Sequence, residues 1–83
     1  DPRIDDTLGW ICYKKKMLPQ AIASLEESVT RDPTNHLHQY HLGMAYIQSG
    51  DWPRARLALE RAIKSPAYPI AEEARKALTQ IGG

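Results

Sequence analysis

The sequence predicts an all-α fold in which helical hairpins repeat along the chain. Leu8-Gly9 recurs 34 residues later as Leu42-Gly43, and a fixed period of this length is typical of stacked helical repeats. The same offset relates Pro19 to Pro53, Ala21 to Ala55, Leu25 to Leu59 and Glu26 to Glu60. Apolar residues also recur with a helical period of about 3.6 residues between the prolines and glycines. We therefore expect two copies of a helix-turn-helix unit followed by one closing helix.

Length and composition narrow the class of protein further. A chain of 83 residues allows one domain with a modest core, and stacked repeats lower the core that each unit needs. The net charge of +1, with charges interspersed, predicts neither a nucleic-acid partner nor a membrane surface. No apolar run is long enough for membrane insertion, and no signal segment is present. Because the chain starts at Asp1 rather than Met, we expect a fragment of a longer protein.

The first helix is predicted over residues 3–15. Asp1 is its expected N-cap and Pro2 its first helical residue, since the first turn leaves its amides unpaired in any case. Cys12 is expected to be a small buried apolar side chain, and a single cysteine cannot form an internal disulfide. Lys16 follows at a position that favours glycine, where a left-handed backbone would cost about 1 kcal/mol.

The second helix is predicted over residues 19–31 and the third over 36–49. Pro19 opens the second, because proline is tolerated in a first turn. Asp32-Pro33 forms the turn between them, with Asn35 or Thr34 as the next N-cap.

The fourth helix is predicted over residues 53–64 and the fifth over 70–81. Gly50 is expected to end the third helix in the left-handed conformation. Pro66 and Pro69 are expected to prevent the fourth helix from continuing. The fifth has one apolar face and one charged face, which is typical of a capping helix.

Gly43 lies inside the third predicted helix, where glycine costs about 1 kcal/mol relative to alanine. We expect a neighbouring helix to pass too close to Gly43 for a Cβ atom.

At these positions the sequence resembles the tetratricopeptide repeat (TPR) family. The second copy supplies the family pattern at Leu42, Gly43, Tyr46, Gly50, Ala55, Leu59 and Ala62, whereas the first copy departs at Cys12, Lys16 and Ser28. The resemblance implies one domain over residues 1–83, an α-solenoid with a right-handed superhelix. Its parts would be repeat 1 over about 2–35, repeat 2 over about 36–67 and a C-terminal capping helix over about 69–81.

The resemblance also implies function: a non-enzymatic module that binds a peptide or helix of a protein partner in a concave groove. The first helix of each unit would line this groove. The predicted partner-binding residues are Trp10, Tyr13, Leu37, Tyr40, Met44 and Ile47, flanked by Arg3, Asp6, Lys14 and Gln48. Exposed apolar strips usually mark contacts, and aromatic residues are favoured anchors. The alternative is that these side chains pack against the capping helix or against further repeats.

One TPR subclass grips the C-terminal carboxylates of chaperone tails with Lys, Asn and Arg at fixed groove positions. Asp6, Trp10 and His41 stand at its first three groove positions here, so the resemblance does not imply an acidic-tail ligand.

The alternative function is that of a terminal segment of a longer solenoid, used for self-association or scaffold assembly. Ile4, Leu8 and Ile11 would pack on an upstream repeat, so a homo-oligomer would form through this N-terminal edge or through the groove. A weaker resemblance, in residues 6–11 and 71–78, is to C-terminal repeats of bacterial TPR proteins linked to exopolysaccharide export. It implies a bacterial cytoplasm or periplasm.

No residue pattern predicts catalysis, a cofactor or a metal. His36, His38 and His41 lie close together, but no cysteine or well-spaced carboxylate joins them, and His36 and His38 are expected in an exposed first turn. Adjacent carboxylates such as Asp5-Asp6 are expected at the solvated surface.

Overall fold

A computed structural model describes residues 1–82 of the chain. Over these residues it forms five α-helices and no strand, so the all-α prediction is confirmed. The helices are α1 (Pro2–Lys14), α2 (Leu18–Arg31), α3 (His36–Ser49), α4 (Trp52–Ala62) and α5 (Tyr68–Gln80). Every predicted boundary lies within two residues of the observed one.

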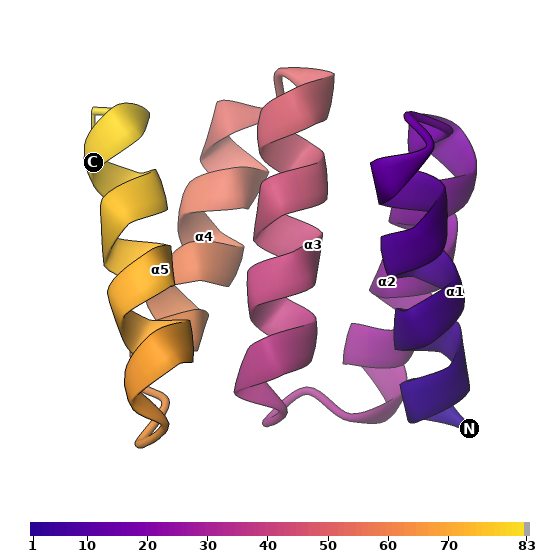
Figure 1. Ribbon diagram of the computed structural model, residues 1–83, viewed down its shortest axis with the longest axis horizontal. Helices are drawn as coiled ribbons and strands as arrows, with labels where there is room; N and C mark the ends of the chain where they lie inside the picture. The colour runs from indigo at the N-terminus through magenta and orange to yellow at the C-terminus, as the bar shows by residue number, and fades with distance from the viewer. Residues whose placement is uncertain (83) are drawn as a thin grey trace.

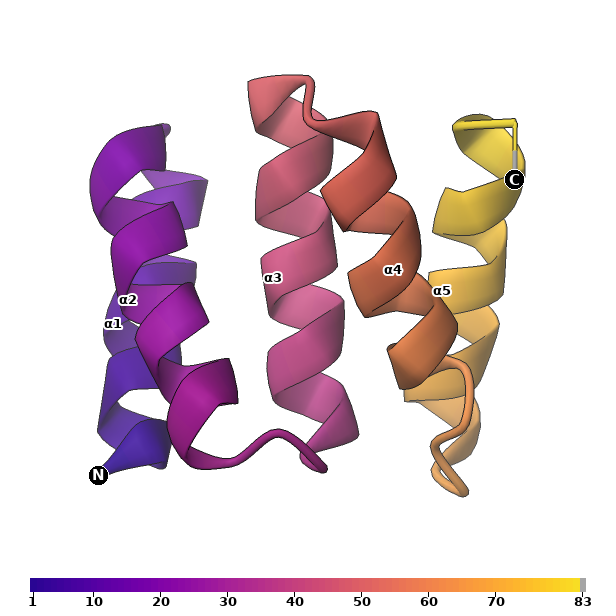
Figure 2. The ribbon, with the colours of Figure 1, turned by 180° about the vertical axis from the view of Figure 1, so that it is seen from behind.

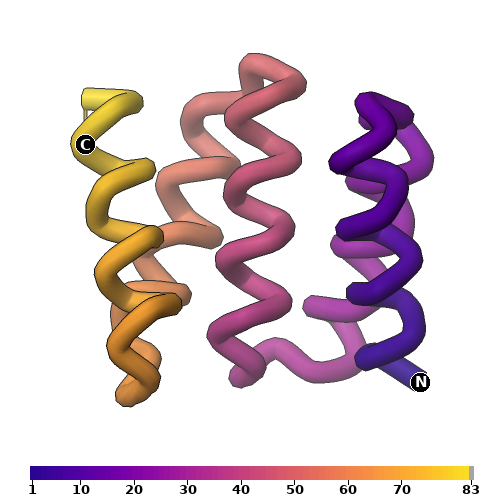
Figure 3. The backbone as a smooth tube through the Cα atoms, in the orientation of Figure 1, coloured from indigo at the N-terminus to yellow at the C-terminus, as the bar shows by residue number. Residues whose placement is uncertain are grey.

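The helices form two layers (Figure 1). α1, α3 and α5 make one layer, while α2 and α4 make the other, which faces the viewer in Figure 2. The hairpin of α1 and α2 lies beside the hairpin of α3 and α4, and α5 packs on both helices of the second hairpin. The two chain ends therefore lie at opposite ends of the stack (Figure 3).

Polar side chains cap the starts of α1, α3 and α4. The side chain of Asp1 accepts a hydrogen bond from the Arg3 amide at 2.9 Å, and that of Asn35 accepts one from the His38 amide at 3.1 Å, which confirms both as N-caps. α4 ends at Ala62, before Pro66 and Pro69, and Pro69 lies in the first turn of α5. Backbone N–H groups in the first turn of a helix have no partner within the helix, so a proline without this group is tolerated there. α5 therefore begins at Tyr68 instead of after Pro69.

The ends of α1 and α3 show the internal repeat in their hydrogen bonds. The amide of Met17 donates to the Cys12 carbonyl at 2.9 Å, and the amide of Asp51 donates to the Tyr46 carbonyl at 3.0 Å. Each bond closes around a left-handed residue: Lys16, with a φ of 62°, after α1, and Gly50, with a φ of 82°, after α3. The left-handed conformation predicted at Gly50 is confirmed, and Lys16 also adopts it, at a cost of about 1–2 kcal/mol.

Two interior glycines let the helices of each hairpin cross closely. A Cβ atom on Gly43 would lie 2.7 Å from Cγ of Leu59, and one on Gly9 would lie 2.6 Å from Cγ of Leu25. Both leucines are fully buried, so the space that a Cβ would need is filled. The predicted close crossing at Gly43 is confirmed.

Two apolar clusters hold the stack together. The first joins the two hairpins, and the second joins α4 to α5 through small side chains that allow close approach. The first consists of Leu25, Leu42, Ala45, Tyr46 and Ala55, and the second of Leu59, Ala62, Ala74 and Ala77. Cys12 is buried beside this core, as predicted.

Across residues 1–82, none of the helices combines the length and the apolar character that a membrane span requires.

Candidate functional site

An aromatic cluster spans the two repeats on the α1–α3 side of the molecule. The ring of Trp10 stacks on Tyr13, with centroids 4.5 Å apart and planes 5° apart, and on His41, with centroids 4.0 Å apart. Tyr40 lies tilted at 6.4 Å from Trp10. Lys14 places its Nζ 5.8 Å from the Trp10 ring centroid, within the range of a cation–π contact. We call Trp10, Tyr13, Tyr40 and His41 the aromatic cluster.

The structure brings three of the six predicted groove residues into this cluster: Trp10, Tyr13 and Tyr40. Met44 and Ile47 are half-buried, and together with Tyr40 they pack against the apolar cluster that joins α4 to α5. Leu37 remains 40% exposed in the first turn of α3. Tyr40, Met44 and Ile47 therefore share part of their surface with α4 and α5, as in the alternative that these side chains pack against the capping helix.

A buried hydrogen-bonded pair, Asp6 and His41, lies next to Trp10, at a place where the sequence predicted surface. Asp6 is only 5% exposed, and Nδ1 of His41 lies 2.8 Å and 2.9 Å from its two carboxylate oxygens. Because an ionised carboxylate only accepts hydrogen bonds, Nδ1 of His41 is the donor. A buried carboxylate is tolerated when it is paired in this way. The prediction of Asp6 as a solvated residue was wrong, since α3 lies directly over it.

The three histidines do not share one environment. His38 was predicted to be exposed but is 3% exposed, with its Nε2 4.0 Å from Oδ2 of Asp6. His36 is half-buried rather than exposed. A carboxylate does join two of the histidines, contrary to prediction, yet residues 1–82 contain no group of three or more side chains able to hold a metal ion.

A second polar contact ties the hairpins together and was missed from the sequence. The Tyr46 hydroxyl donates to the carboxylate of Glu26 on α2. Burial, followed by this hydrogen bond, raises the pKa of Tyr46 above its ordinary value. Burial also raises the pKa of Tyr40, with a further contribution from the negative charge of Glu73 on α5.

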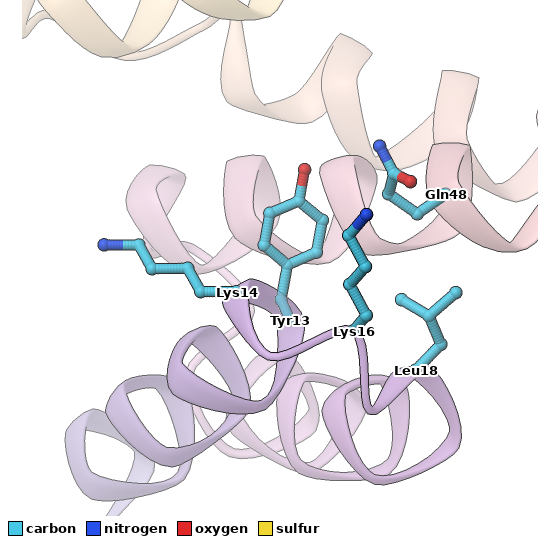
Figure 4. Close-up of a pocket in the computed structure, with 5 residues that line it drawn as sticks. All are labelled: Tyr13, Lys14, Lys16, Leu18 and Gln48. Atoms are coloured by element: carbon cyan, nitrogen blue, oxygen red, sulfur yellow. The ribbon is translucent and has the colours of Figure 1, made fainter.

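A pocket of about 260 Å³ opens where the α1–α2 turn meets the end of α3. Its lining consists of Tyr13, Lys14, Lys16, Leu18 and Gln48. Figure 4 shows the Tyr13 hydroxyl, the Lys16 ammonium and the Gln48 amide directed into the same space, while the Lys14 side chain points away. We call this hollow the Lys16 pocket. The sequence signal that was available for it was a lysine in a glycine position.

The opposite face of α1 is apolar and open. Ile4, Leu8 and Ile11 are 66%, 51% and 47% exposed, and they line a shallow hollow with Asp1, Arg3 and Thr7. One repeat later, His38 and Leu42 occupy the positions of Ile4 and Leu8 and are buried. The same helix face is thus covered in the second repeat and uncovered in the first.

Comparison with known proteins gave one family. The family model described as tetratricopeptide repeat matches residues 18–71 and also residues 40–81, so its matches cover more than half of the chain. No curated protein and no solved structure gave a significant match. The resemblance to repeats linked with exopolysaccharide export is not addressed by this match and stays a prediction.

Proposed function

The chain belongs to the tetratricopeptide repeat family, whose members generally mediate protein–protein interaction without being enzymes, and from this premise we propose that it binds a segment of a protein partner along α1 and α3. The segment would lie across the aromatic cluster as a short peptide or a helix. α3 has 14 residues and is therefore about 21 Å long, which matches about six residues of extended chain.

One observation carries this proposal: aromatic rings from both repeats gather on one face and stay partly accessible. Trp10 and Tyr13 come from α1, whereas Tyr40 comes from α3, and all three are half-buried. Half-buried aromatic rings offer a large apolar area at a small entropic cost, and they are frequent anchors in interfaces. Leu37 adds an exposed apolar side chain on α3.

The proposal is tested by selecting random peptides displayed on phage against the immobilised protein. We expect enriched peptides with aromatic or large aliphatic residues, which bind the wild type and fail to bind a Trp10→Ala, Tyr40→Ala variant. Trp52→Ala is the matched control, because Trp52 is an exposed aromatic residue on α4 in the other layer. Circular dichroism verifies that each variant keeps its helicity. Peptides that bind the double variant and the wild type equally would place the working surface elsewhere.

A second candidate function is self-association, or scaffold assembly as the terminal part of a longer array. It is favoured by the exposed face of Ile4, Leu8 and Ile11, whose counterparts in the second repeat are buried by another hairpin. Sedimentation equilibrium over a concentration series tests it. We expect association that is abolished by Leu8→Glu and kept by Leu57→Glu, since Leu57 is equally exposed on α4. A wild type that stays monomeric at every concentration would contradict this candidate.

A further inference from the structure

We propose that the Lys16 pocket binds an acidic side chain of the partner segment, next to an apolar residue of that segment on the aromatic cluster. The inference rests on the proposed function and adds the chemistry of the ligand. The pocket would receive one Asp or Glu carboxylate from within the segment.

The pocket contains hydrogen-bond donors that the fold leaves unused. In residues 1–82, the side chains of Tyr13, Lys16 and Gln48 take part in no hydrogen bond and no ion pair. Their hydroxyl, ammonium and amide groups can all donate, and they converge on the same space (Figure 4). The lining contains no acidic residue, and Lys16 directs its positive charge into this space, whereas the Lys14 side chain points away. An ionised carboxylate, which only accepts hydrogen bonds, complements this set in charge and in hydrogen-bonding character.

The backbone at Lys16 gives an independent reason to assign a role to its side chain. Lys16 is the residue other than glycine with a positive φ within the described part of the chain. Its counterpart one repeat later is Gly50, which adopts the same conformation without strain. Strained left-handed residues persist only where the surrounding structure holds them, and they concentrate at active sites and ligand-binding sites. A lysine here projects its ammonium group over the pocket toward Gln48 (Figure 4).

Stabilisation of the end of α1 explains Lys16 less well than a role in binding does. Lysines near a helix C-terminus interact favourably with the helix dipole, and this explains Lys14 in the last turn of α1. The carbonyls at the end of α1 already accept hydrogen bonds from the amides of Lys16 and Met17. A glycine at position 16 would keep these backbone bonds and remove the strain.

The pocket is continuous with the aromatic cluster through Tyr13. One face of this side chain stacks on Trp10, while its hydroxyl points into the pocket. A segment anchored on Trp10 therefore passes the pocket, so that a side chain from within the segment reaches Lys16. Leu18 also lines the pocket and offers an apolar contact for the methylene groups of an Asp or Glu side chain.

The test uses the same phage-displayed random peptides, which have no free C-terminal carboxylate because their C-termini are fused to the coat protein. We expect the enriched sequences to place an Asp or Glu close to their apolar anchor. A synthetic, C-terminally amidated peptide with the consensus sequence should bind the Lys16→Gly and Tyr13→Phe variants about three- to tenfold more weakly, as measured by fluorescence anisotropy. Replacing its acidic residue with Gln or Asn should weaken binding to the wild type by the same factor.

Lys15→Gln is the matched control, since it removes the same charge from a residue outside the pocket and should leave affinity unchanged. Tyr13→Phe keeps the ring that stacks on Trp10 and removes only the hydroxyl. Enriched apolar peptides without an acidic residue, or equal losses in Lys16→Gly and Lys15→Gln, would overturn the inference and leave the groove proposal standing. No enrichment at all would refute the groove proposal together with this inference.

Discussion

Replacing Gly43 with alanine tests the packing on which the repeat depends. The new Cβ would lie 2.7 Å from both Cγ and Cδ2 of Leu59 and 3.5 Å from the carbonyl oxygen of Ala55. Cγ of Leu59 is not the flexible end of that side chain, and Leu59 is fully buried, so α4 has to move away from α3. Overpacking of this kind costs about 1–3 kcal/mol.

An opposing effect sets the sign of the expected result. Alanine is favoured over glycine in a helix interior by about 1 kcal/mol, so an unobstructed substitution would stabilise the protein. With the clash included, the free energy of unfolding should fall by about 1 kcal/mol. The melting temperature should then fall by about 4–8 °C for a domain of this size. Gly43→Leu, which adds three more carbon atoms, should prevent folding.

Thermal and urea unfolding followed by circular dichroism measure this change. Gly9→Ala serves as an internal replicate, because its Cβ would meet Leu25 in the same way, and Gln20→Ala serves as an exposed helical control. A melting temperature raised by several degrees in both glycine variants would refute the reasoning, since that is the behaviour of a glycine without a close neighbour.

Three further predictions follow from the polar contacts and the turn. Asp6→Ala and His41→Ala should each lower the free energy of unfolding by about 3 kcal/mol, because each leaves a buried partner unpaired. Replacing both residues with Leu should cost much less. Urea unfolding measures these changes, and effects of the two substitutions that simply add would contradict this coupling. The free energy of unfolding should fall as the pH rises above about 10, because the unfolded chain then releases a Tyr46 proton that the folded protein retains. Tyr46→Phe should flatten this pH dependence, as measured by urea titrations between about pH 8 and pH 11. Lys16→Gly should raise the melting temperature, because it removes a left-handed lysine conformation that destabilises the fold by about 1–2 kcal/mol. A lower melting temperature would argue against backbone strain at this position.

Much of the fold could be predicted because helix starts and close helix crossings depend on the residues at those positions. Proline and the capping side chains set the helix starts, and the Leu-Gly pair specified where two helices cross. The residues that were misassigned are those whose environment is set by a neighbouring helix. Asp6 and His38 carry the polar side chains of a surface, and only the position of α3 against α1 reveals that they are buried.

The candidate site was predicted in part, for a related reason. The family resemblance placed Trp10 and Tyr40 on one face, but it could not specify how far α5 extends over Met44 and Ile47. The packing of α5 depends on the close approach of Ala74 and Ala77 to α4, which a helical period alone does not determine. Local pattern therefore identifies the elements, whereas the accessible width of the site depends on packing between elements.

The proposed binding surface and the junction between the repeats share the same residues. Trp10 stacks directly on His41, and His41 is held by the buried carboxylate of Asp6 from the first repeat. The Trp10 ring of α1 therefore packs on a side chain of α3, and a partner that binds Trp10 also affects this contact between the helices. If the aromatic cluster is the binding surface, a bound segment stabilises the contact between the hairpins as well as its own interface, and binding should raise the melting temperature of the wild type by mass action. The Asp6→Ala variant should then bind the same segment more weakly although Asp6 does not touch it, because its loss leaves His41 free to turn away from Trp10.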